Sequence, residues 1–226
     1  MNTHQQLRAY TNSTHTKDQA LALMREHKRL DHIIQGTYAR GKGDNFKGCL
    51  VGCATGGDHM QFEPVFGIPR RLAWLADDIF EGLTPADAAA FAVDFFSAIA
   101  PGADLIRVCD AWCAWVLGDP VDGLVAISTE PSVKDMAALF ARAAAGDEPE
   151  EQQWSVASDA AWAARAAKAA RAAWDAWAAR DARSASVASA AIAASAAIAA
   201  SSAIAVKQRD ALLRLLATMN PTGETT

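Results

Sequence analysis

The last third of the chain is an alanine-rich repeat, and this feature restricts the fold more than any other. Of the 46 residues in 160–205, 26 are alanine. From Trp162 to Lys207 the larger residues recur at about every third position, and this X-Ala-Ala pattern is typical of a duplicated low-complexity origin. Alanine has the highest helix propensity, and no Gly or Pro occurs in 154–219. We therefore expect a helical extension over 154–219, as one long helix or as a hairpin that turns near 184–186.

One part of this extension is long enough to cross a bilayer, because 184–206 holds 23 residues without a charge. Five of them are strongly apolar and six are serine. Each apolar residue favours insertion by only about a few tenths of a kcal/mol, so five hardly offset six serines. Residues 1–20 also contain no apolar signal-peptide core, and four cysteines without such a signal favour reduced thiols. We expect a cytoplasmic protein with no membrane span.

The net charge of −5 conceals an uneven distribution. The formal charge is +4 over 1–50, −13 over 58–159 and +4 over 160–226. An acidic middle between basic ends indicates that these parts contact one another, or that the acidic face repels nucleic acid. Three solvated surfaces are the alternative.

Hydrophobic spacing and turn signals predict a mainly α-helical protein. We expect a flexible arm over 1–16, a compact helical domain over 17–146, a linker over 147–153, the extension over 154–219 and a flexible tail over 220–226. Within the domain, helices are predicted over 17–35, 69–82, 85–100, 104–117 and 132–146. Thr84-Pro85 with Asp87 is a helix start with a capping box, and Ser132 is the expected cap of the last helix.

Seven glycines in 36–60 indicate a short hairpin or turn region. Short strands are expected over 37–39 and 49–54, and a further one over 124–127. A glycine-rich loop lets a ligand approach the backbone, so this region is the first place to look for a site. Neither the phosphate-binding P-loop nor the dinucleotide-binding fingerprint fits its glycine spacing.

A thiol site is one interpretation of this region. Cys49 or Cys53, with His59 or His32 as the base, could form a thiolate nucleophile. The same four residues could instead hold zinc, although a three-residue gap between cysteines is not the common two-residue knuckle. Small buried cysteines at a tight turn are the third interpretation.

Two further groups carry chemistry in principle. Asp77, Asp78 and Glu81 lie together on the 69–82 helix, and Asp77 and Glu81 share a face suited to acid–base work, to a divalent cation, or simply to water. Cys109 and Cys113 repeat the cysteine spacing among apolar residues, which favours one apolar helix face.

The extension offers a binding surface, because its basic residues alternate with tryptophans. Such a pattern suits phosphate contacts and base stacking, docking on an acidic protein, or packing against the acidic middle of this chain. The candidate binding residues are Trp162, Arg165, Lys168, Arg171, Trp174, Trp177, Arg180 and Arg183.

Several ordered motifs resemble a family of uncharacterised bacterial and phage proteins. They are Gly-Thr-Tyr at 36–38, Lys-Gly-Cys-Leu-Val-Gly-Cys at 47–53, His59, GIPRRLAWLADDIFEG at 67–82 and Gly-Ala-Asp-Leu at 102–105, followed by an alanine-rich tail. The resemblance covers about residues 30–215, and residues 44–46 are an insertion relative to it. It implies an architecture and no activity. The occurrence of such proteins in phages and mobile elements implies a host-directed inhibitor, such as an anti-CRISPR protein.

The leading hypothesis is therefore a non-catalytic binding or inhibitor protein with no cofactor, which occupies a host protein or nucleoprotein complex or sequesters a ligand. Nucleic acid is a possible partner of the basic extension, and self-association into a homo-oligomer is open. The alternative is a hydrolase or transferase that depends on Cys49, Cys53 and His59.

Overall fold

The structure is a computed structural model that describes residues 7–11, 13–160 and 187–219, with the backbone alone over 187–201. The chain is mainly α-helical, as the sequence predicts. Its contacts divide it into two compact units, one formed by 1–109 with 202–226 and the other by 110–201. The sequence-based boundary at 147–153 falls inside the second unit, where residues 151–160 are helical.

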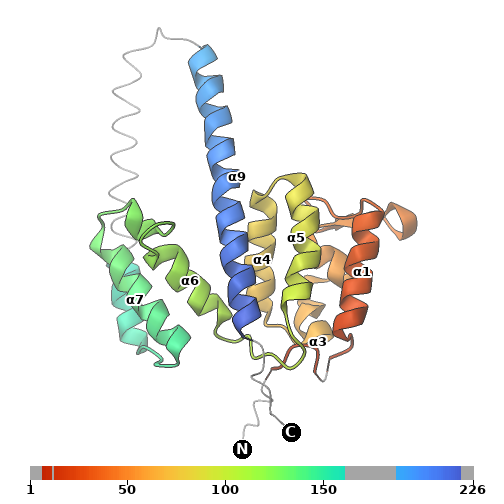
Figure 1. Cartoon of the computed structure of the whole chain (residues 1–226), viewed down its shortest axis with the longest axis horizontal. Coiled ribbons are helices and arrows are strands. Elements are labelled where there is room, and N and C mark those ends of the chain that lie inside the picture. The colour runs from red at the N-terminus through yellow and green to blue at the C-terminus, as the bar shows by residue number, and fades with distance from the viewer. Residues whose placement is uncertain (1–6, 12, 161–186, 220–226) are drawn as a thin grey trace, which may run out of the picture. The chain divides into compact units, whose positions relative to one another are not determined.

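Three helices form the centre of the first unit and lie side by side in Figure 1: α1 (Lys17–Arg29), α4 (Arg70–Gly82) and α5 (Pro85–Ala98). The short helix α2 (Leu50–Thr55) contacts α1 and α4, and the short helix α3 (Phe62–Phe66) contacts α2 and α4. Burying one phenylalanine side chain contributes about 1.5–3 kcal/mol, so the aromatic cluster dominates this core. Its fully buried members are Phe62, Phe66, Phe80, Phe91, Phe95 and Phe96.

Residues 7–11, which precede α1, pack on this core, in contrast to the flexible arm expected over 1–16; residues 1–6 lie outside the described residues. The amide of Ala9 donates to the carbonyl oxygen of Ala103, and the amide of Tyr10 donates to that of Phe66. Ala9 is fully buried, and the Tyr10 hydroxyl donates to the Phe96 carbonyl oxygen at 3.2 Å. The polar sequence concealed this because most of its hydrogen bonds are made by the backbone.

Helix α1 begins at its Thr16 capping box and ends at Arg29, six residues before the predicted end. Asp31 then adopts a left-handed conformation (φ 59°), and Ile33 pairs with Gly48 in an isolated parallel bridge. The expected hairpin follows as β1 (Ala39–Arg40) and β2 (Lys47–Gly48), joined through the 3-10 turn η1 (Gly43–Asn45). The apolar residues after Arg29 therefore lie beside the hairpin and do not extend α1.

The strand expected over 49–54 is wrong, because Leu50–Thr55 forms helix α2. The Cys49 Sγ caps this helix by accepting from the Gly52 amide at 3.3 Å, and Gly56 ends it in a left-handed conformation (φ 65°). The glycine-rich surroundings suggested a short strand, whereas the two ends carry a cap and a glycine stop typical of a helix.

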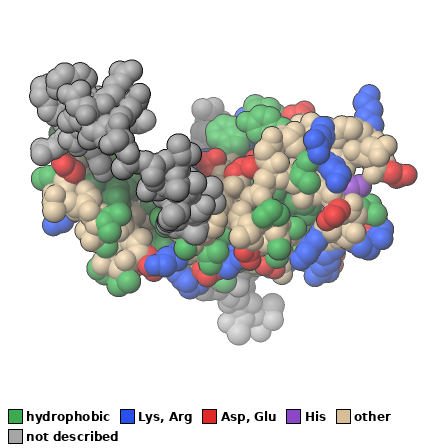
Figure 2. Space-filling model, turned by 90° about the horizontal axis from the view of Figure 1, so that it is seen from above, with side chains coloured by type: hydrophobic (Ala, Val, Ile, Leu, Met, Phe, Trp, Pro, Cys, Tyr) green, Lys and Arg blue, Asp and Glu red, His purple; other side chains and the backbone are tan. Residues whose placement is uncertain are grey.

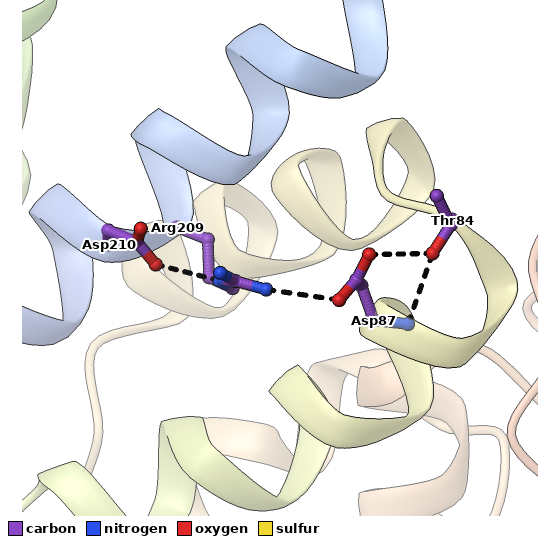
Figure 3. A network of polar contacts seen from close by, with 4 residues as sticks. All are labelled: Thr84, Asp87, Arg209 and Asp210. Atoms are coloured by element: carbon purple, nitrogen blue, oxygen red, sulfur yellow. Dashed lines mark hydrogen bonds and ion pairs between the residues drawn. The ribbon is translucent and has the colours of Figure 1, made fainter. Parts of the chain in front are cut away.

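The start of α5 confirms the Thr84-Pro85 prediction, since the Thr84 hydroxyl accepts from the Asp87 amide at 3.3 Å. The Asp87 carboxylate accepts from the Thr84 hydroxyl at 2.6 Å, a side-chain contact that differs from the reciprocal backbone bond of a capping box. Its other oxygen lies 3.4 Å from Arg209 (Figure 3).

Arg209 belongs to α9 (Val187–Thr218), the long C-terminal helix that confirms the helical prediction for this part of the alanine-rich extension; residues 161–186 lie outside the described residues. Its C-terminal part belongs to the first unit and runs beside α4 in Figure 1. A Cβ on Gly82 would lie 3.0 Å from the Ala205 Cβ, so small residues allow the two helices to approach closely there. Leu212 and Leu216 are fully buried. Residues 184–186, where a hairpin could turn, lie outside the described residues.

The second unit contains most of α6 (Val108–Gly118), the 3-10 turn η3 (Leu124–Ala126) and α7 (Pro131–Ala145). Helix α6 begins four residues later than expected, and η3 replaces the strand expected over 124–127. Pro131, and not Ser132, begins α7, whose predicted stop at Gly146 is confirmed by a left-handed φ of 90°. Phe140 packs against Trp154 with ring centroids 4.9 Å apart.

Within the described parts of the chain, no helix is long and apolar enough to cross a membrane. On the face seen in Figure 2, side chains of both charges are interspersed with apolar ones over the first unit.

Candidate functional site

Cys49 occupies the junction between β2 and α2. Its amide donates to the Thr37 carbonyl oxygen at 3.0 Å, and its Sγ caps α2. The Tyr38 carbonyl passes so close that a Cβ on Gly52 would overlap its oxygen, and one on Gly48 would lie 2.7 Å from it. Because both glycines lack a side chain, the backbone at Tyr38, just before β1, can lie against the start of α2. Cys49 is buried there.

His59 follows α2 in the chain and also contacts Cys49. Gly56 and Gly57 turn the chain back with φ angles of 65° and 97°, and His59 begins the 3-10 turn η2 (His59–Gln61). Its Nε2 lies 3.4 Å from the Cys49 Sγ. The Tyr38 ring meets the His59 ring edge-on, with centroids 4.4 Å apart. This contact fixes the plane of a half-buried imidazole.

Asp77 is the third member of the cluster and comes from the middle of α4. It lies on the buried face of that helix, with Ala73 and Phe80, and one of its oxygens accepts from the Val51 amide at 3.4 Å. One ligand atom each from Cys49, His59 and Asp77 lie within 4.8 Å of one another. A thiol, an imidazole and a carboxylate from three separate elements therefore lie close together.

Burial dominates the electrostatics of this cluster. It raises the pKa of Cys49 to about 12, and the nearby Asp77 carboxylate adds to that rise. Burial likewise raises the pKa of Asp77, although contact with Cys49 and the Val51 amide partly offsets it. Cys49 and Asp77 would thus each carry a negative charge in a buried environment that disfavours charge. A cation between them would stabilise both charged forms.

This arrangement is poorly suited to a nucleophilic thiol acting alone. A reactive cysteine needs a lowered pKa, supplied by cationic neighbours or a helix N-terminus. Cys49 does cap the short helix α2, and the Gly52 and Val51 amides lower its pKa, but burial and the adjacent Asp77 carboxylate raise it by more. The His59 contact gives the base that such a mechanism requires, but the raised pKa of Cys49 opposes formation of the thiolate.

The structure separates the other two predicted ligands from this cluster. The Cys53 Sγ donates to the carbonyl oxygens of Gly48 at 3.3 Å and His32 at 3.5 Å, and burial raises its pKa to about 12. The His32 Nδ1 lies 3.2 Å from the His27 Nδ1, and its Nε2 lies 3.2 Å from the Asp44 carbonyl oxygen. Of the predicted zinc set His32, Cys49, Cys53 and His59, the structure therefore groups only Cys49 and His59 in one cluster of possible ligands among the described residues.

The acidic group predicted on α4 is also divided. A Glu81 oxygen accepts from the Gly36 amide at 2.8 Å, whereas Asp77 faces Cys49. Asp78 is exposed. Cys109 and Cys113 both lie on α6, the first buried and the second partly exposed. The eight candidate binding residues of the extension, in 162–183, lie outside the described residues.

Asp77 is the residue that sequence reasoning did not connect to the cysteine and histidine. One signal for it exists in the sequence: Asp77 falls one helical turn from Ala73 and from Phe80, on the apolar face of α4. Carboxylates are almost never fully buried without a partner. A carboxylate on that face therefore indicates an interaction partner on another element. In the structure, its neighbours are Cys49 and His59.

A row of exposed side chains borders this cluster. Met60 follows His59, and the Arg70 Nη1 donates to its Sδ at 3.1 Å. The Arg70 guanidinium lies 6.0 Å from the centroid of the Trp74 ring. Tyr38, Met60 and Trp74 are each more than half exposed. Tyr38 thus contacts His59, Met60 follows it in the chain, and Arg70 connects Met60 with Trp74.

Comparisons with known proteins returned no match: no family model, no curated protein and no solved structure is similar to this chain at a significant level. The resemblance to bacterial and phage proteins stays a prediction, and the function has to be argued from the cluster itself.

Proposed function

We propose that this protein binds a divalent transition metal ion, best matched by zinc, through Cys49, His59 and Asp77. The observation that carries the proposal is the convergence of one thiol, one imidazole and one carboxylate within 4.8 Å. Zinc accepts all three donor types, and softer thiolate and imidazole ligands favour it over magnesium and calcium.

The spacing of the donors supports this choice. In a tetrahedral site with Zn–S near 2.3 Å and Zn–N near 2.0 Å, sulfur and nitrogen lie about 3.5 Å apart. The Cys49 Sγ and the His59 Nε2 are separated by 3.4 Å. An ion between them would replace the thiol proton, since zinc binds cysteine as the thiolate.

The proposed metal keeps one coordination position open. Among the described residues, the cluster has three members, and no fourth His, Cys, Asp or Glu joins it. Structural zinc sites are closed by four protein ligands, whereas catalytic sites hold three and leave the fourth position to water or substrate. The cluster therefore supports a ligand-binding metal of the catalytic type, which would act as a Lewis acid on a ligand oxygen.

Cobalt substitution tests this proposal directly. The protein, purified without a metal-affinity tag, is stripped with EDTA and titrated with Co²⁺, which gives a thiolate-to-cobalt charge-transfer band when cysteine coordinates. We expect the band at one Co²⁺ per chain, absent in Cys49→Ser and weakened in His59→Gln. Cys53→Ser is the matched control, because Cys53 bonds only to carbonyl oxygens. An equal band in Cys49→Ser and the unchanged protein would overturn the proposal.

A thiol-dependent hydrolase or transferase is the second candidate, favoured by the 3.4 Å contact between Cys49 and His59. It requires one thiol far more reactive toward iodoacetamide than the other three at neutral pH. Slow labelling of Cys49 in the metal-free protein, at a rate no higher than that of Cys53, would count against this candidate and leave the metal site intact.

The binding or inhibitor function predicted from the extension stays a prediction. Deleting 154–226 would remove Leu212 and Leu216 from the core of the first unit, so loss of binding by that truncation would have two explanations. The double variant Trp174→Ala/Trp177→Ala tests binding by the extension more directly, and Ser195→Ala is its control within the same repeat.

A further inference from the structure

The side chains beside the metal cluster indicate which class of ligand would fill the open position. We infer that the ligand is a small organic anion with a flat or apolar portion, which coordinates the metal at one end and meets the Arg70 guanidinium with its negative group at the other. This inference rests on the proposed metal site and deepens it.

Arg70 is available for an anion. Its backbone amide is bonded to a Glu63 oxygen at 3.0 Å, while its guanidinium contacts the Met60 sulfur, a weak acceptor. Within residues 7–160 and 202–219, no carboxylate forms an ion pair with this guanidinium. Arg71 differs, because its Nη2 donates to the Ile106 carbonyl oxygen at 2.8 Å. A guanidinium without a carboxylate matches the bidentate geometry of an incoming carboxylate or phosphate.

The positions of Arg70 and Asp77 on α4 indicate the size of the ligand. The two residues are seven positions apart, which places their Cα atoms on nearly the same side of the helix, about 10 Å apart along its axis. A ligand with a ring or short chain between its metal-binding and anionic groups matches that separation of the two residues along the helix.

The surface between the two ends suits such a ring. Trp74 lies between Arg70 and Asp77 on α4 and is 52% exposed, which is unusual for so large an apolar side chain. Tyr38, 71% exposed, contacts the His59 ring edge-on. Aromatic rings prefer offset or edge-on contacts with other rings, so Trp74 and Tyr38 favour a flat ligand portion.

Two hydroxamates form the test. Benzohydroxamate carries a zinc-binding group on a ring, and 4-carboxybenzohydroxamate adds a carboxylate at the far end. Binding of each to the cobalt-loaded full-length protein is followed through the visible bands of the metal. We expect the carboxylate to tighten binding about tenfold, as a charge-assisted hydrogen bond does. That gain should disappear in Arg70→Gln and persist in Arg71→Gln.

Trp74→Ala separates the ring contact from the charge contact. We expect it to weaken both hydroxamates about three- to fivefold, which is the size of one aromatic contact, and to preserve the carboxylate preference. Cobalt content is measured for every variant, so that loss of the metal is distinguished from loss of the ligand.

The outcomes distinguish the two proposals. If no thiolate–cobalt band forms, the metal site itself is wrong. If the band forms and benzohydroxamate binds, but the added carboxylate gives no gain or Arg70→Gln retains it, the metal site stands and the inferred ligand class is overturned.

Discussion

Arg209 in α9 and Asp87 in α5, 122 positions apart in the sequence, form an ion pair of 3.4 Å that joins the C-terminal helix to the start of α5. The same carboxylate accepts the Thr84 hydroxyl at 2.6 Å, and Arg209 also contacts Asp210 at 2.9 Å (Figure 3). One aspartate thus links the cap of α5 to the position of α9, whose buried leucines belong to the same core.

Breaking this network should loosen the first unit by a modest amount. Arg209→Met removes a pair whose Asp87 side chain is 43% exposed, so we expect a loss of about 0.5–1 kcal/mol in the free energy of unfolding. Thr84→Ala removes the cap and should lower it by about 1 kcal/mol. Urea unfolding of both single variants and the double variant gives the coupling. Strictly additive losses would show that the two contacts act independently.

Leu212→Ala provides a stronger test of α9 as part of the core. Leu212 is fully buried, and a leucine-to-alanine change in a core lowers the free energy of unfolding by about 2–5 kcal/mol. Ile204 is 56% exposed on the same helix, so Ile204→Ala is the control and should change it by less than about 0.5 kcal/mol. Equal effects from both changes would contradict the packing of α9 described above.

Asp77→Asn should stabilise the metal-free protein while weakening its metal binding. Burial raises the pKa of Asp77 in the folded chain, so its contribution to stability is fully present below the unfolded pKa near 3.8 and is lost as the pH rises through the folded pKa. Asparagine resembles the neutral form at every pH. In EDTA, the variant should be more stable than the unchanged protein at pH 7, and the two should converge near pH 3.

Exposed Asp78 provides the control for that experiment, and Asp78→Asn should leave both stability and metal binding nearly unchanged. A metal-free Asp77→Asn protein that is less stable at pH 7 would show that the carboxylate is satisfied without a metal ion. That result would remove the electrostatic argument for a cation at the cluster.

Mild acid should destabilise the protein through the paired histidines. Burial, and then the neighbouring His32, lower the pKa of His27. A histidine with a lowered folded pKa contributes stability that is present above about pH 6.5 and is lost as the pH falls through the folded value. The free energy of unfolding should therefore decline below pH 6.5. His27→Gln should flatten this decline, and an unchanged slope would exclude His27 as its source.

The alkaline limit should depend on Tyr10. Its hydroxyl is bonded to the Phe96 carbonyl oxygen, and burial raises its pKa well above the ordinary value of 10. The neutral phenol thus contributes stability below pH 10 that is lost as the pH rises beyond it. Tyr10→Phe should lower stability by about 1 kcal/mol at pH 7 and remove this alkaline decline. A variant with the same alkaline decline would contradict the assignment.

The sequence predicts an element well where its signals are local. Thr84-Pro85 begins α5 as expected, and Gly146 ends α7, because a cap and a left-handed glycine act within one helical turn. The same local signals were present around α2, yet its glycine-rich surroundings suggested a short strand. Residues 50–54 form a continuous buried run, and such a run does not distinguish a short buried helix from a strand.

The candidate site shows the same limit. Cys49 and His59 lie close in sequence, and a glycine-rich turn between them makes their meeting foreseeable. The position of Asp77 beside Cys49 depends on how α4 packs against α2. No local sequence pattern specifies that contact between elements. Cys53 is one turn from Cys49, but the direction of its side chain toward the Gly48 carbonyl oxygen becomes visible only in the folded chain.

Zinc content is the measurement that tests the central claim most directly. The full-length protein and its Cys49→Ser and Cys53→Ser variants are stripped, reloaded with excess Zn²⁺, dialysed and analysed by elemental mass spectrometry. We predict one zinc per chain in the unchanged protein and in Cys53→Ser, and a large loss in Cys49→Ser. Zinc absent from all three, or retained equally by all three, would contradict a metal centre at Cys49, His59 and Asp77.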